Sequence, residues 1–150
     1  FNGGSTLNLS SELPNVLVST MLAGSSGLVA GLILGLVRSK GPDVELLMNG
    51  SLAGLVAITA NPLAISTGNA ILVGAIGCLV MLGLNALLIR LRIDDAVGAI
   101  PVHLGAGVWG TLAVALFGDL DRLGRSPSAW DNICLFRPRP CWLVVFGRLA

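Results

Sequence analysis

The chain has 150 residues, of which 54% are hydrophobic and 11% are charged, and its formal net charge at pH 7 is +1. Because soluble domains carry about 25% charged residues, this composition excludes an ordinary soluble protein. The near-neutral charge, with no basic face, argues against a nucleic-acid partner. The composition therefore indicates an integral membrane protein.

The sequence contains three long runs without a fixed charge, at 16–37, 46–89 and 96–118. The second run is about twice as long as the roughly 20 residues that one transmembrane helix needs. The turn-forming stretch "ANPLAISTGNA" at 60–70 divides it into two helices. No run alternates with a period of two, as strands would. We therefore predict an all-α polytopic helical bundle with about four complete transmembrane helices, at 14–37, 46–61, 69–89 and 96–118.

Basic residues gather in two of the predicted loops. Arg38 and Lys40 follow the first helix, and Arg90 and Arg92 follow the third, whereas the turn at 60–70 carries no charge. Positively charged loops mark the cytoplasmic side of a membrane protein. We therefore expect the first and third helices to run toward the cytoplasm and the second and fourth to run away from it.

Glycines recur every four residues on the first two predicted helices. Gly27, Gly31 and Gly35 follow this spacing on the first helix, and Gly50 and Gly54 follow it on the second. Helices in lipid associate through small residues that let their backbones approach closely. The glycines therefore predict close packing of these two helices.

His103 is the only histidine of the chain and lies inside the fourth predicted helix. It follows Asp95 by eight positions, or about 12 Å of helix, which places it within the hydrocarbon. Gly107, Gly110 and Thr111 share its helical face. An ionisable residue within a span indicates an ion or proton pathway; the alternative is a packing histidine bonded to a neighbouring helix. A neutral imidazole donates one hydrogen bond and accepts one, which suits the passage of a small polar solute or a proton.

The start of the fourth helix carries two further features. Asp94 and Asp95 lie where carboxylates cap free amides and oppose the helix dipole, so we interpret both as structural helix caps. Pro101 lacks a backbone N–H, and we expect it to kink the helix by freeing the carbonyl of Val97.

No pattern in the sequence indicates an enzyme, because it has no nucleophile–base pair, no metal-ligand cluster and no phosphate loop. The spacing of Cys78, Cys134 and Cys141 does not match a metal site. We therefore expect no enzymatic activity, no metal and no cofactor, and we expect Cys78 to lie in the core.

Three stretches resemble the ammonium transporter (Amt/Mep/Rh) family. "DDAVGAIPVHLGAGVWGTLAVALF" at 94–117 is similar to the late pore helix of that family, in which a histidine follows an Asp-Asp pair at this spacing. "FNGGSTL" at 1–7 resembles the end of its sixth transmembrane helix, and "MNGSLAGLVAITA" at 48–60 resembles its eighth. The motifs stand in the family's order, and the resemblance covers residues 1 to about 124.

The resemblance implies an eleven-helix protomer, usually a homotrimer with one pore in each subunit, in which two sets of five helices form an inverted repeat. The four predicted helices then correspond to the seventh to tenth, in the second repeat. The implied function is to move ammonia across the cell (inner) membrane through a histidine-lined hydrophobic pore. The alternative is an ammonium-sensing membrane domain of a signalling protein, with cytoplasmic signalling domains or a regulatory protein as partners.

The resemblance also implies roles for three residues. His103 matches the second of the family's paired pore histidines, and Phe1 matches the inner of two stacked phenylalanines that close the pore from outside. Ser5 matches the hydroxyl that binds ammonium in the outer vestibule. A cation gains energy over an aromatic face, and it would lose its proton before the apolar section, where an ion costs several kcal/mol.

Other polar residues of these motifs have plainer explanations. We expect Asn2 and Asn49 to form interhelical bridges. We expect the Thr59 hydroxyl to bond its own helix backbone instead of a ligand.

Two departures from the family stand out. The chain starts at Phe1, so the first five helices and their pore residues are missing, and we expect the 150-residue chain to conduct nothing alone. Where an eleventh apolar helix would follow, "RPRP" at 137–140 would break a span. We therefore divide the chain into a partial transporter domain at 1–124 and an aberrant tail at 125–150, with a frameshift near residue 125 as the hypothesis.

Overall fold

The computed structural model describes residues 2–4, 11–39, 41, 43–60 and 62–118, and the fold of this part is all-helical, as predicted. A short π-helix, η2 (Ile100–Gly105), leads directly into the last α-helix. Within the described residues, the extended structure is limited to one isolated bridge between Ile65 and Gly118. The elements are α1 (Leu13–Ser39), α2 (Val44–Ile58), α3 (Thr67–Arg90), η2 (Ile100–Gly105) and α4 (Ala106–Phe117).

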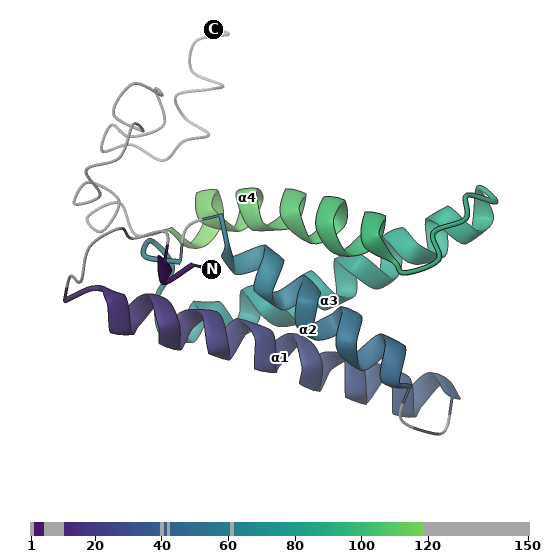
Figure 1. Ribbon diagram of the computed structural model, residues 1–150, viewed down its shortest axis with the longest axis horizontal. Helices are drawn as coiled ribbons and strands as arrows, with labels where there is room; N and C mark the ends of the chain where they lie inside the picture. The colour runs from purple at the N-terminus through teal and green to yellow at the C-terminus, as the bar shows by residue number, and fades with distance from the viewer. Residues whose placement is uncertain (1, 5–10, 40, 42, 61, 119–150) are drawn as a thin grey trace, which may run out of the picture.

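Successive helices run in alternating directions along one bundle (Figure 1). The α1–α2 and α3–η2 connections lie at one end, and the α2–α3 turn lies at the other, where the Ile65–Gly118 bridge joins it to the end of α4. Arg38, Arg90 and Arg92 therefore belong to the same end of the bundle. This is the arrangement that the distribution of basic residues predicts.

Three helical stretches are long and apolar enough to cross a membrane, namely Leu13–Arg38, Thr67–Arg90 and Ile100–Phe117. The apolar helix α2 is shorter, with 15 residues, or about 22 Å, against a hydrocarbon core of about 30 Å. It ends at Ile58 instead of the predicted residue 61. The stretch that follows it turns toward α3 as predicted.

Side-chain caps define where α2 and α3 begin. The Asp43 carboxylate accepts a hydrogen bond from the Leu46 amide at 3.3 Å, and the Ser66 hydroxyl accepts one from the Asn69 amide at 3.4 Å. Each side chain satisfies an amide that the first helical turn leaves free. Because Ser66 is the cap, α3 starts at Thr67, two residues before the predicted start.

The glycines of α1 and α2 bring the two backbones together, as predicted. A Cβ atom added to Gly27 would overlap the backbone oxygen of Gly50, and one added to Gly54 would overlap that of Ala23. At Gly31, an added Cβ would lie 2.9 Å from the Leu46 oxygen. Only glycine fits at such close crossings.

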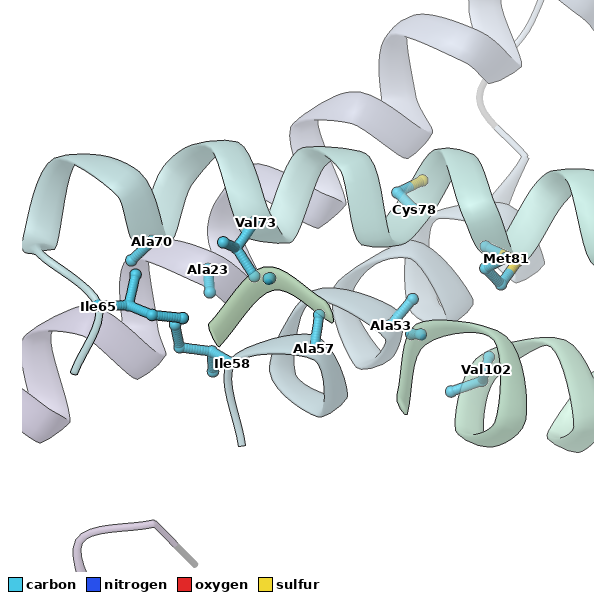
Figure 2. Packing of buried hydrophobic residues seen from close by; sticks show 12 residues of the cluster. Ala23, Ala53, Ala57, Ile58, Ile65, Ala70, Val73, Cys78, Met81 and Val102 are labelled. Atoms are coloured by element: carbon cyan, nitrogen blue, oxygen red, sulfur yellow. The ribbon is translucent and has the colours of Figure 1, made fainter. Parts of the chain in front are cut away.

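Small and branched side chains fill the interior between the helices. Figure 2 shows Ala53, Ala57 and Ile58 of α2 and Val73 of α3 as members of one buried cluster. Cys78 is fully buried in the same cluster, so its predicted place in the core is confirmed. Many large hydrophobic side chains point outward, such as Met21 on α1 at 68% exposure, as expected of helices that face lipid or further protein.

The end of α3 stores local strain at an arginine. The Arg92 amide bonds the Ile89 oxygen, and the Ile93 amide bonds the Leu88 oxygen at 3.0 Å, which is the Schellman arrangement. Arg92 has a φ of +57°, at the position that glycine usually occupies in this motif. The left-handed conformation costs an L-residue about 1–2 kcal/mol.

Replacing Arg92 with glycine is therefore expected to raise the free energy of unfolding by about 1 kcal/mol. The matched control is Arg90→Gly, which removes the neighbouring arginine from the last turn of α3 and should cost about 0.5–1 kcal/mol. Thermal unfolding of the purified full-length protein in detergent measures both. Equal destabilisation by the two changes would show that the conformation of Arg92 carries no strain.

Candidate functional site

The helix that carries His103 begins later than predicted. Residues 96–98 form a turn with Gly98 at a φ of +67°, and the helical backbone starts at Ala99. The Asp95 carboxylate accepts hydrogen bonds from the amides of Ala99 at 3.1 Å and Ile100 at 2.7 Å. The predicted start at residue 96 was wrong, because Asp95 reaches over the Gly98 turn to amides four and five positions away.

Asp94 and Asp95 have different surroundings despite being adjacent. Asp95 is half-buried and holds two amides, whereas Asp94 is exposed and forms no hydrogen bond with the described part of the chain. Asp94 can act on the helix only through its charge near the positive end of the helix dipole.

Pro101 lies in the first turn of the helix, where its missing N–H leaves no helical hydrogen bond unmade, so its position gives no reason for the predicted kink. The helix instead opens into the π-helical segment Ile100–Gly105, in which the Ala106 amide bonds the Pro101 oxygen. π-helical turns inside α-helices are frequent at functional sites. His103 lies in the middle of this turn.

His103 lies in the wall of a cavity of about 660 Å³, formed by residues of α1, α2, η2 and α4 together with Asn2, Thr59 and Ala60. Its side chain is exposed and makes no hydrogen bond within the described residues. Gly107 and Thr111, which share its helical face, line the same cavity, whereas Gly110 packs against Ala57 of α2. The described part of the chain therefore does not show the packing histidine that was the alternative.

The rest of the wall combines apolar and hydroxyl side chains. Leu52, Leu55 and Val56 of α2 supply its apolar part. Thr20 of α1 and Thr59 at the end of α2 contribute hydroxyls. The Thr59 hydroxyl donates a hydrogen bond to the Leu55 oxygen at 2.7 Å, so the predicted backbone bond is confirmed.

The two asparagines differ in their contacts. The buried Asn2 amide donates to the Thr20 hydroxyl at 3.1 Å and so ties its segment to α1, as predicted. Asn49 is half-buried, and a Cβ added to Gly98 would lie 3.0 Å from its amide nitrogen. The interhelical hydrogen bond predicted for Asn49 is absent from the part of the chain that the structure describes.

Two of the predicted site residues, Phe1 and Ser5, lie outside the described residues. Within the described ranges, no group of three or more His, Cys, Asp or Glu side chains could hold a metal ion. The candidate site in the described ranges therefore consists of His103 and the cavity beside it.

Sequence reasoning missed one residue that positions the helix of His103. The Trp109 indole N–H donates a hydrogen bond to the Val73 oxygen at 3.0 Å, which links α4 to α3. The available signal was a tryptophan inside an apolar helix, because a buried indole N–H usually finds an acceptor.

Removing the Asp95 carboxylate is expected to destabilise the fold. Asp95→Ala should lower the free energy of unfolding by about 0.5–2 kcal/mol, the usual cost of a lost helix cap, because two amides lose their acceptor. Asp94→Ala is the matched control and should change stability by less than about 0.5 kcal/mol. Both are measured by thermal unfolding of the full-length protein. An Asp95→Ala protein as stable as the Asp94→Ala protein would contradict the capping role.

The comparison with known proteins agrees with this architecture. The Ammonium Transporter Family model matches residues 1–132. An ammonium transporter homologue from Synechocystis sp. is 43% identical over 149 residues, covering 98% of this chain and 28% of the relative. Ammonium transporter Amt2 of Archaeoglobus fulgidus is 37% identical over 120 residues, covering 79% of this chain and 26% of the relative.

Solved structures of the same family superpose on the helices. A structure titled "Sensor Amt Protein" is 38% identical with a TM-score of 0.76, over 81% of this chain and 30% of that one. A Mep2 deletion mutant from Candida albicans is 26% identical with a TM-score of 0.77, over 89% of this chain and 35% of that one. The relatives are named ammonium transporters, and the expectation that the chain is not an enzyme agrees with those names.

The predicted tail at 125–150 lies outside the described residues. The family match and the alignment with the Synechocystis relative both reach past residue 124, where a change of reading frame would be expected to end them. The boundary and the frameshift stay predictions, which resequencing of the source DNA tests.

The match to the family covers most of this chain, and the chain in turn spans 28% of the length of its Synechocystis relative. The helices of spanning length and the close glycine crossings fit the same conclusion. The chain belongs to the ammonium transporter family, of whose transmembrane domain it forms a part.

Proposed function

We propose that the full-length protein moves ammonia across the membrane through a hydrophobic, histidine-lined pore, and that the cavity beside His103 is the part of the pore wall supplied by this chain. One observation carries the proposal: an ionisable side chain within a spanning helix points into a cavity and has no hydrogen-bond partner in the described residues. Such residues are costly in a membrane and serve a pathway by default.

The lining of the cavity suits a neutral solute better than an ion. Leu52, Leu55 and Val56 carry no charged or polar group that could replace the hydration shell of a cation. Moving a cation into such apolar surroundings would cost several kcal/mol. His103 can donate one hydrogen bond to ammonia and accept one from it. Ammonium would therefore give up its proton to water before this section and would cross the section as ammonia.

Phe1 and Ser5 are proposed for the outer end of the same pathway. An aromatic ring attracts a cation over its face, and a hydroxyl oxygen accepts a hydrogen bond from ammonium. Both residues belong to the stretch that precedes α1. Together they would concentrate ammonium where it gives up its proton.

The assembly of the full-length protein is also a proposal. The outward-facing apolar side chains of the described helices, such as Met21 and Val37, leave wide surfaces for lipid, for the remaining helices and for other subunits. We propose a homotrimer in the cell (inner) membrane, with cytoplasmic signalling domains or a regulatory protein as further partners.

A second function is favoured by one comparison, because the structure titled "Sensor Amt Protein" is 38% identical to this chain with a TM-score of 0.76. In that case the same cavity would bind ammonium and report it to cytoplasmic signalling domains. The two functions differ in whether solute crosses the membrane.

Reconstitution of the full-length protein in liposomes distinguishes them. Methylammonium is the better flux probe, because ammonia crosses protein-free bilayers by itself, and protein-free liposomes serve as the control. Methylammonium uptake and an ammonium-evoked change of internal pH, both faster than in the protein-free liposomes, are the expected result. Saturable ammonium binding without uptake would replace the transporter with the sensor.

A further inference from the structure

Three threonines line the cavity, and each donates its hydroxyl hydrogen to its own helix. The Thr20 hydroxyl bonds the Val16 oxygen at 2.7 Å, that of Thr59 bonds the Leu55 oxygen at 2.7 Å, and that of Thr111 bonds the Val108 oxygen at 2.8 Å. A threonine hydroxyl has one hydrogen to donate and two lone pairs that accept. With the hydrogen committed, each oxygen can only accept from a molecule in the cavity.

The three oxygens are not equally available. Thr20 already accepts a hydrogen bond from the Asn2 amide at 3.1 Å. Thr59 and Thr111 are exposed to the cavity, and no donor in the described part of the chain reaches either oxygen. Thr111 follows His103 by two helical turns, and Thr59 lies at the end of α2, so both belong to the half of the bundle that ends at the Ile65–Gly118 bridge.

We infer that Thr59 and Thr111 determine which solutes the cavity binds. Because their hydroxyl oxygens can only accept hydrogen bonds from a molecule in the cavity, they favour solutes that carry several N–H donors. The inference rests on the proposed function, because it assigns the solute of the same cavity to the ammonium class. Ammonium and ammonia can donate to such oxygens, whereas a solute that only accepts hydrogen bonds would leave its own acceptors and these oxygens unpaired. His103, which can both donate and accept, does not make this distinction.

Valine and serine substitutions test the inference, because valine keeps the branched shape without the hydroxyl and serine keeps the hydroxyl. In the full-length protein, Thr59→Val and Thr111→Val are each expected to weaken ammonium affinity about five- to tenfold, the effect of losing one hydrogen bond. Thr59→Ser and Thr111→Ser should bind as the wild type does. Ser26→Ala is the matched control, since the Ser26 hydroxyl also bonds its own helix, at Ala23, but packs against α3 at Gly74.

Two readouts separate this inference from the proposed function: calorimetric binding of ammonium and methylammonium uptake by liposomes. Weaker binding in the valine variants, with serine and Ser26→Ala variants unchanged, supports the inference even if the wild type transports nothing, a result that would overturn only the transport proposal. Wild-type affinity in both valine variants, or equal losses in the valine and serine variants, overturns the inference. A wild type that neither binds nor transports ammonium overturns both.

Discussion

Gly54→Ala is expected to disrupt the packing of α1 against α2, because the added Cβ atom would overlap the backbone oxygen of Ala23. A backbone cannot move aside as a flexible side chain can, so the helices must separate. The expected loss in the free energy of unfolding is about 1–3 kcal/mol, and more if the crossing opens. Thermal unfolding of the full-length protein in detergent measures it.

The control for this change is Gly83→Ala in α3, where an added Cβ would meet no atom within 4 Å. Because alanine favours a helix over glycine by about 0.8–1.0 kcal/mol, Gly83→Ala should be neutral or stabilising. A Gly54→Ala protein that is as stable as Gly83→Ala would mean that the two backbones are not in contact at this crossing.

The helical content and the close contact of α1 with α2 were predictable because both follow from local patterns. The length of the runs without a charged residue indicated the transmembrane helices. The recurrence of glycine every four residues placed Gly27 and Gly31 on one face of α1, and Gly54 on one face of α2. The reach of Asp95 over the Gly98 turn was not predictable, because a cap usually bonds amides two or three positions ahead. The π-helical turn around His103 has no comparable sequence signature.

The cavity could be predicted only in part. The sequence indicated that His103, Gly107 and Thr111 share a face, and they do line one wall. It could not indicate that Thr20 of α1 and Leu52 of α2 complete the wall, because that depends on how three helices cross. For Asn49 the prediction from the sequence was wrong. An asparagine in this position favoured an interhelical hydrogen bond, but Asn49 forms none with the described residues.

His103→Ala is expected to lower transport by the full-length protein about tenfold or more, because the solute loses its hydrogen-bonding partner in an apolar passage. Stability should change little, since His103 is exposed to the cavity and bonds no described residue. Leu104→Ala is the matched control, because Leu104 is 58% exposed and does not line the cavity. It should transport as the wild type does.

The proposed transport function requires that the cavity beside His103 lies on the path of the solute. The initial rate of methylammonium uptake into liposomes, measured for the wild type, His103→Ala and Leu104→Ala at equal protein density, tests it most directly. A large loss of uptake, or a changed selectivity for ammonium, is expected in His103→Ala alone. Equal uptake by all three proteins, with unchanged selectivity, would contradict it.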